Sequence, residues 1–195
     1  MSWKWSIIVG ISAAFLGGSG CSLQPQLVRV TPSVMSKTAE NDRGGASVGV
    51  AAFDVRPDQK LGIITDAHDR KVDVATTGDV AAALSDAVTQ ALASSGFKTK
   101  PAGSDDSTSL RLELQELSFN ALKQPFDFDV GLKVVVSAKA RNGLDSYDRT
   151  FTVTQRKAAG APPSKAETTL MVNDAVGVAL SDMLADQELI NFLAR

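Results

Sequence analysis

The sequence predicts an α+β fold, a two-layer sandwich of a mostly antiparallel sheet with two amphipathic helices on one face. One observation is the alternation of apolar and polar residues through most of 110–154, which is typical of strands with one buried face. Another is the recurrence of apolar residues at helical spacing over 80–96 and again from Ser164 to the C-terminus. Each helix can bury its apolar stripe against the sheet, which produces two layers.

The chain begins with an export signal that ends at its only cysteine. Lys4 precedes an apolar run over 7–16, and small residues then lead to Cys21. A basic start, a short apolar core and small residues before a cut describe a signal peptide, here residues 1–20. A cysteine directly after the cut resembles the lipobox of bacterial lipoproteins, although leucine usually stands where this chain has Gly18. We therefore expect a mature protein that begins at an acylated Cys21.

Two other interpretations of this segment are an uncleaved membrane helix and a secreted protein with a free thiol. The apolar run is shorter than the roughly 18 to 20 residues that a bilayer requires. A bacterial lipoprotein carries a diacylglyceryl group and usually a third acyl chain such as palmitate, and two or more chains hold a protein firmly. Ser22 stands where aspartate retains enteric lipoproteins in the inner membrane. We therefore expect the protein in the outer membrane, facing the periplasm.

The rest of the chain is long enough for one domain with a sizeable core. Cleavage of residues 1–20 from the 195-residue chain leaves 175 residues. Residues 33–46 have little apolar content, so we take 21–46 as the lipidated N-terminus and linker and 47–195 as a single α+β domain. The net charge of −2, without a basic block, gives no reason to expect nucleic acid as a partner.

The strands of the first half are short. Alternation over 27–31 predicts an edge strand at best, because Pro32 has no backbone donor. A clearer alternation over 47–55 predicts the first good strand. The segment 60–69 is ambiguous, and 71–74 is a possible short strand.

The longest alternations lie in the second half. The segment 110–119 slips by one residue at Glu116, which is the signature of a β-bulge. The alternation over 126–141 ends at Asn142-Gly143, a strong hairpin signal, and 147–154 alternates again. These segments predict an antiparallel meander with one apolar face and one polar face.

Both helices carry recognisable end signals. One of residues 77–79 caps the first helix, and Gly96 ends it. Ser164 begins the second helix, and Asp186 caps a final apolar turn. Asn173 lies within the apolar stripe of the second helix, where we expect a buried, hydrogen-bonded side chain rather than a ligand.

The sequence offers no catalytic set. His68 is the only histidine, and although three aspartates lie near it, no second histidine or cysteine is available as a metal ligand. A Gly-x-Ser-x-Gly nucleophile motif is missing as well. We therefore expect no enzyme, no cofactor and no metal site. The aspartates beside His68 are Asp66, Asp69 and Asp73.

Two pairs of charged residues are candidates for weaker roles. Asp54 and Arg56 share one face at a strand end, either as a surface ion pair of little energetic value or as a weak partner-binding site. Asp127 and Asp129 also share a strand face, as paired carboxylates do in acid–base catalysis. We expect instead that lysines of the same strand balance them, namely Lys133 and Lys139.

The order of these segments resembles a known family. It comprises the lipobox, Val28-Arg29-Val30-Thr31-Pro32, Asp54-Val55-Arg56, an alanine-rich helix closed by Gly96-Phe97, the Asn142-Gly143 hairpin and a last helix that ends in the segment 186–193. This set is similar to the YajG-type lipoproteins of Gram-negative bacteria over nearly the whole chain. That family has no established biochemical activity, so the resemblance implies an envelope location and a fold, and only Cys21 as a functional residue.

Three hypotheses of function follow. The leading one is a non-catalytic lipoprotein that binds a protein partner in the cell envelope through a sheet edge or the polar sheet face. The second is a lipid-handling accessory subunit of an envelope transport complex, which would need an apolar groove between sheet and helices. The third is a periplasmic hydrolase, which the missing catalytic sets disfavour. A likeness of fold cannot choose among them.

Overall fold

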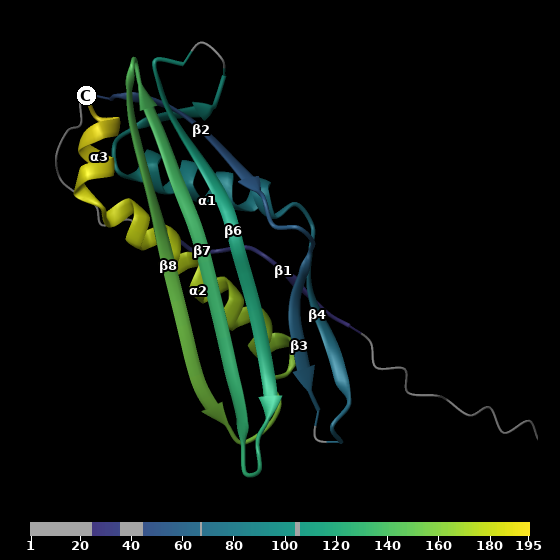
Figure 1. Cartoon of the computed structure of the whole chain (residues 1–195). Coiled ribbons are helices and arrows are strands. Elements are labelled where there is room, and N and C mark those ends of the chain that lie inside the picture. Colours follow the sequence, from purple (N-terminus) through teal and green to yellow (C-terminus); the bar gives the residue numbers. More distant parts are fainter. Residues whose placement is uncertain (1–24, 36–44, 67, 104–105) are drawn as a thin grey trace, which may run out of the picture.

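In the part of the chain that the computed structural model describes, eight strands form one sheet and three helices lie on one face of it (Figure 1). The described residues are 25–35, 45–66, 68–103 and 106–195. The strands are β1 (Gln26–Arg29), β2 (Ser47–Asp54), β3 (Lys60–Thr65), β4 (Lys71–Thr77), β5 (Lys98–Pro101), β6 (Thr108–Lys123), β7 (Phe128–Asn142) and β8 (Asp145–Ala159). The helices are α1 (Val80–Ser94), α2 (Lys165–Ala185) and α3 (Gln187–Leu193).

The predicted meander is confirmed in β6, β7 and β8. β7 pairs antiparallel with β6 on one side and with β8 on the other. The expected bulge lies between Leu114 and Glu116, where the register of β6 against β7 shifts. Leu114 and Leu117 therefore both face the helices, since the extra residue restores the buried face after the slip. The hairpin closes at the pair Asn142 and Asp145, directly around Gly143 and its neighbour.

The prediction of a mostly antiparallel sheet is wrong. Four of the seven pairings in the described chain are parallel: β1 with β4, β2 with β5, β2 with β6, and β3 with β6. The strands β2 and β3 share the edge of β6 that β7 leaves free, one along each half of it. The relative direction of paired strands could not be predicted from the sequence, because alternation indicates only which face of a strand is buried and not which strand lies beside it.

The core fills the space between the helices and the sheet. Every second residue of β7 from Phe128 to Ala140 is buried, and the residues of β6 that pair with those from Val130 to Ala140 are buried as well. α2 packs against β7 and β8, whereas α1 packs against β2 and β5. The largest fully buried side chains include Phe119, Leu180 and Met183. Burial of this kind contributes on the order of 1.5–3 kcal/mol per large side chain.

The ends of the helices match the expected signals. Asp79 caps α1 by accepting a hydrogen bond from the Ala82 N–H at 2.9 Å. Ser164 and Glu167 form a reciprocal capping box at the start of α2. Asp186 ends α2 and caps α3.

The short strand β1 is held to α2 by the segment that follows it. The Asn173 side chain accepts a hydrogen bond from the Thr31 N–H at 2.5 Å and donates one to the Arg29 carbonyl at 3.0 Å. One turn further along α2, Gly177 lies so close to this segment that a Cβ atom there would come within 2.4 Å of the Ser33 carbonyl oxygen. Asn173 is therefore hydrogen-bonded and half-buried, in a structural role close to the one expected.

Candidate functional site

The predicted lipidation site lies outside the described residues. Cys21, the signal peptide at 1–20 and most of the linker fall in 1–24 and 36–44. The structure therefore describes the body that an anchor at Cys21 would carry. Within that body, no helix is long and apolar enough to span a membrane.

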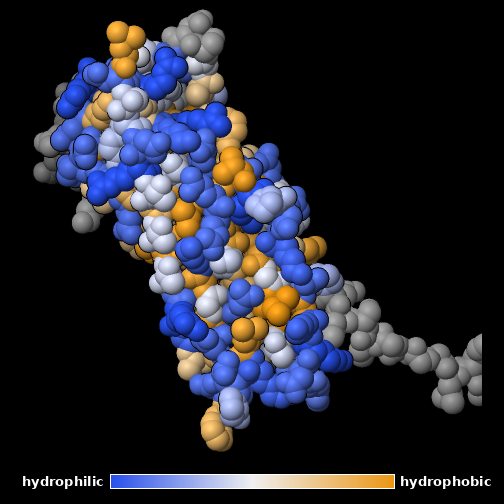
Figure 2. Space-filling view, in the orientation of Figure 1, coloured by the Kyte–Doolittle hydropathy of each residue, from blue (hydrophilic) through white to orange (hydrophobic). Residues whose placement is uncertain are grey.

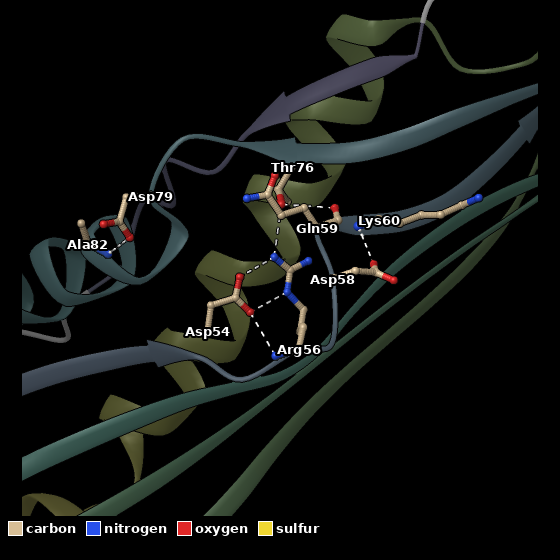
Figure 3. Close-up of polar contacts among 8 residues, drawn as sticks. All are labelled: Asp54, Arg56, Asp58, Gln59, Lys60, Thr76, Asp79 and Ala82. Carbon is tan, nitrogen blue, oxygen red and sulfur yellow. Dashed lines mark hydrogen bonds and ion pairs between the residues drawn. The ribbon is translucent and has the colours of Figure 1, made fainter.

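Asp54 and Arg56 form a bidentate ion pair where β2 leaves β6, with the Arg56 side chain buried and Asp54 partly exposed (Figure 3). Arg56 donates from Nε to Asp54 Oδ1 at 2.8 Å and from Nη2 to Oδ2 at 2.6 Å. The same Nη2 reaches Thr76 Oγ1 on β4 at 3.2 Å, and only 4% of the Arg56 side chain is exposed. The pair therefore ties the end of β2 to β4. That a partner also contacts these residues stays a prediction.

The loop around His68 is organised by Asp66. The Asp66 carboxylate accepts hydrogen bonds from the His68 N–H at 2.8 Å and from the Arg70 Nε at 2.7 Å. Burial alone would raise the pKa of Asp66, but the hydrogen bonds from Arg70 and His68 outweigh it and lower that pKa. The nearby Asp69 and Asp73 pair with lysines of other segments. Among the described residues, no group of three or more histidine, cysteine or acidic side chains is placed to hold a metal ion.

The face of the sheet opposite the helices is polar, as predicted for the longest strand, and is laced with ion pairs. Glu113 accepts hydrogen bonds from Lys139 at 2.7 Å and from Arg111 at 2.9 Å. The bond from Lys139, and then that from Arg111, outweigh burial and lower the pKa of the Glu113 carboxyl. The Arg111 guanidinium also lies 3.9 Å from the centre of the Phe53 ring, within the range of a cation–π contact.

The partners of the charged residues on this face differ from those expected. Lys139 pairs with Glu113, and Lys133 pairs with Glu116 at 2.7 Å. Asp129 instead bonds to Arg156 of the neighbouring strand β8. The expected pairing within one strand is wrong because cross-strand neighbours lie closer than residues four or more positions along a strand.

A hollow of about 300 Å³ lies on this open face, across β6, β7 and β8, at the end of the meander that is far from the 142–145 hairpin. Its centre is Gly131, where an added Cβ would meet no atom within 4 Å. Leu122 contributes an apolar wall and is 41% exposed. Figure 2 shows the face, with hydrophobic atoms visible between hydrophilic side chains over these strands. The polar side chains that border it on this face are Ser118, Asn120, Asp129, Lys133, Thr154 and Arg156.

Sequence reasoning missed this hollow, although a signal was present. Gly131 interrupts the longest alternating segment in the chain, at a position on its polar face. A glycine inside a strand weakens it, and often marks a bulge, a bend or a place where another group approaches closely. The signal could be used only once β6 and β8 were known to flank it, since three strands build the hollow.

A second polar cluster joins β8 to the junction of α2 and α3. The Asp186 carboxylate accepts hydrogen bonds from the Tyr147 hydroxyl at 3.1 Å, from the Glu188 N–H at 2.9 Å and from Arg149. Burial and the adjacent carboxylate raise the pKa of Tyr147 to about 12. Burial alone would raise the pKa of Asp186, but the backbone and side-chain donors together lower it. All of these groups satisfy one another, which indicates a structural role.

The chain belongs to a family of uncharacterized lipoproteins, whose model matches residues 32–194. This assignment confirms the predicted resemblance at the level of a lipoprotein family. It covers the described domain, including the open face and the hollow. A comparison with curated protein sequences gives no match.

Two solved structures share the fold at low sequence identity. Protein XCC0632 from Xanthomonas campestris, of the family DUF330, has a TM-score of 0.58 and 13% identity over 81% of this chain and 91% of its own. An uncharacterized protein has a TM-score of 0.51 and 9% identity over 83% and 97% of the two chains. A minor lipoprotein from Acinetobacter baumannii has a TM-score of 0.41 and 10% identity over 77% and 94%. At these identities the likeness to the first two speaks for the fold alone.

Proposed function

We propose that this protein is a non-catalytic lipoprotein that binds a protein partner of the cell envelope through the open face of β6, β7 and β8. Membership of a lipoprotein family supports an envelope protein with a lipid anchor. We place the anchor at Cys21 and the protein on the outer membrane, facing the periplasm, because of the signal-like segment and Ser22. The anchor would hold the domain at the membrane, where a partner meets its open face.

The observation that carries this proposal is the glycine at position 131, in the middle of three paired strands. Its register is continuous with Asn120 on β6 and with Arg156 on β8, so it marks neither a bulge nor a break in the ladder. Among the described residues, no atom lies within 4 Å of the place of its missing Cβ. Glycine in a strand interior costs about 0.5–1 kcal/mol relative to alanine, and nothing within the described chain uses the space that it opens. Close approach by a group from outside the chain is a use of a strand glycine that fits this position.

The walls of the hollow suit an apolar side chain of a protein partner. Leu122 supplies apolar surface, and the ion pairs of Asp129 and Lys133 stand on the rim. Protein interfaces combine a buried apolar anchor with a polar, solvent-exposed rim in this way.

The lipid-handling alternative has less support. It requires an apolar groove between the sheet and the helices, but buried side chains fill that layer in the described part of the chain. A larger hollow of about 740 Å³, beside Leu170, lies between α2 and the segment after β1. The residues that line that hollow come from α2 and from the segment after β1, and none of them belongs to a strand, so it is not the groove between sheet and helices that this alternative requires.

Site-specific photo-crosslinking in cells that express the full lipoprotein tests the proposal. A photoreactive residue in place of Ser118, which lines the hollow from β6 and lies away from the β8 edge, is expected to give a discrete adduct with one envelope protein. Gly131→Leu in the same chain is expected to reduce that adduct at least tenfold, because the new side chain occupies the hollow while its Cβ meets no atom.

The matched control is Thr150→Leu, which adds an apolar side chain to β8 outside the hollow. It is expected to leave the adduct unchanged. Equal adducts from the parent chain and from Gly131→Leu would refute the site. A purified protein that hydrolyses a peptidoglycan, ester or phosphate substrate, and loses that turnover in His68→Ala, would refute the non-catalytic assignment.

A further inference from the structure

The outer edge of β8 is a long template for strand pairing. Among the described strands β8 pairs only with β7, and it forms the left edge of the sheet in Figure 1. Its ladder runs from Asp145 to Ala159 without a register shift, and the strand contains no proline. Edge strands of this length are usually shortened, bulged, covered or protected by charged side chains, because their free N–H and C=O groups pair with other strands. The charges of β8 lie towards its two ends, and its central segment 150–154 carries none.

The hairpin decides which residues of β8 point their backbone groups outward. Asn142 and Asp145 close a two-residue turn, and the closing pair of such a turn is hydrogen-bonded. Hydrogen-bonded and free positions then alternate along the strand. The even-numbered residues, Thr150, Thr152 and Thr154 among them, therefore direct their N–H and C=O groups away from β7.

We propose that β8 pairs antiparallel with β8 of a second copy of this chain, with the two-fold axis at Thr152. This register sets Asp148 opposite Arg156 of the other copy, and Thr150 opposite Thr154, all on the open face. On the helix side it sets Phe151 opposite Val153 of the other copy. Opposite charges, threonine pairs and aromatic–aliphatic pairs are the favourable cross-strand neighbours in antiparallel sheets.

Neighbouring registers lack this complementarity. An axis one residue further along, at Val153, would set Arg149 opposite Lys157, a pair of like charges that destabilises a sheet. An axis at Thr150 would leave Asp148 opposite Thr152, without a cation. The order of charges along β8 thus selects the axis at Thr152.

The helix side of the edge has room for the second strand. A hollow of about 530 Å³ lies beside the edge, between β8 and the C-terminal half of α2. Phe151 and Thr152 border it from the strand and Asp182 borders it from the helix, while the ion pair of Arg149 and Asp186 closes one end of it. Val153 of a second copy, opposite Phe151, would occupy this space, and Thr152 itself is exposed. The two sheets would then form one continuous sheet, with both open faces on the same side.

Disulfide trapping tests the register: the full lipoprotein is oxidised mildly in isolated membranes and then purified in detergent. In Thr152→Cys the two new cysteines of a dimer would have Cα atoms about 5.5 Å apart, within the range of a disulfide. In Thr150→Cys or Thr154→Cys alone, the two cysteines would lie about 13 Å apart along the strands. Mild oxidation is therefore expected to give a covalent dimer from Thr152→Cys, and at least tenfold less from either other variant.

Two further arms complete the test. A mixture of differently tagged Thr150→Cys and Thr154→Cys chains is expected to form the mixed dimer, because these positions lie opposite each other. Thr152→Pro removes the N–H that faces the second copy and leaves the ladder to β7 intact, so light scattering is expected to give a dimer mass for the parent and a monomer mass for this variant. The parent chain measures any background from Cys21.

Three results would overturn the proposal. The first is a monomer mass for the parent chain together with no crosslink in Thr152→Cys. The second is equal crosslinking of all three single-cysteine variants. The third is a disulfide that joins Thr152→Cys to a different protein. Gly131→Leu, which tests the proposed partner site, is expected to leave the Thr152→Cys dimer unchanged, so the two proposals fail separately.

Discussion

The sheet consists of two regions that are held together in different ways. In the meander of β6, β7 and β8, each strand pairs with its neighbour in the chain, over long and nearly uninterrupted ladders. In the region of β1 to β5, short strands pair with partners far along the chain, such as Gln26 with Val74 and Gly49 with Ser109. We infer that side-chain alternation together with the short connections between consecutive strands determines the meander, whereas a few specific contacts between distant segments determine most of the other region.

The substitution with the largest expected loss of stability tests which face of the meander is buried. Leu132 is 3% exposed on the helix side of β7, whereas Lys133 points to the open face. Leu132→Asp buries an unpaired charge and should cost about 4 kcal/mol or more. Lys133→Asp loses an exposed ion pair with Glu116 and should cost about 1 kcal/mol or less. Thermal or urea unfolding measures both, and equal losses would contradict the assignment of faces.

The next effect tests a contact that holds β2 to β4. Asp54→Ala leaves the Arg56 guanidinium almost buried without its carboxylate, which should cost about 2 kcal/mol. Asp54→Ala combined with Arg56→Met removes the charge as well, so the double variant should be more stable than the single one. Urea unfolding of the two variants measures the difference. A double variant that loses as much as the sum of the two single substitutions would show that the pair is not coupled.

The third prediction compares Gly131 of the meander with Gly177 of α2, which packs against the segment after β1. Gly177→Ala brings a Cβ within 2.4 Å of the Ser33 carbonyl and should force this segment away from α2, at a cost of about 1–3 kcal/mol. Gly131→Ala meets nothing within 4 Å and should be neutral or stabilise by up to about 1 kcal/mol. Hydrogen exchange at Thr31 should accelerate only in Gly177→Ala. An unchanged exchange rate there would mean that the segment adjusts without loss of the Asn173 contact.

The smallest expected effect concerns pH. The pKa of Asp186 is lowered in the folded state, so the ionised carboxylate stabilises the fold above the unfolded-state pKa of about 4. This contribution is lost as the pH falls through the lower, folded-state pKa. Asp186→Asn should therefore lower the melting temperature at pH 7 and make it less dependent on pH below about 4. A variant whose melting curve keeps the parent's acid dependence would assign that dependence to other carboxylates, such as Glu113.

Much of the fold could be predicted from local patterns. The bulge at Glu116, the hairpin after Asn142 and the caps at Ser164 and Asp186 all lie where the sequence indicated them. Each is a short-range feature in which a residue acts on its neighbours along the chain. The parallel pairings were not predictable in this way, because nothing within β1 or β2 specifies a partner many residues away.

For the candidate site as well, residue types could be predicted from the sequence, but contacts between strands could not. Residue type alone drew attention to Asp54 and Arg56, but not to the burial of Arg56 or its contact with Thr76. The sequence showed a glycine at position 131 within a strand, but the hollow there forms only because β6 and β8 lie on either side of that strand. The charges on the open face also found partners on adjacent strands, which a single strand cannot specify.

The sequence by itself determined the export signal pattern, the alternating faces and the helix ends, because these depend on spacing along the chain. Only the tertiary structure decided the direction of the short strands, the burial of Arg56, the close packing at Gly177 and the hollow at Gly131. These features arise between segments that meet only after folding, where distance in space rather than in sequence decides which groups interact.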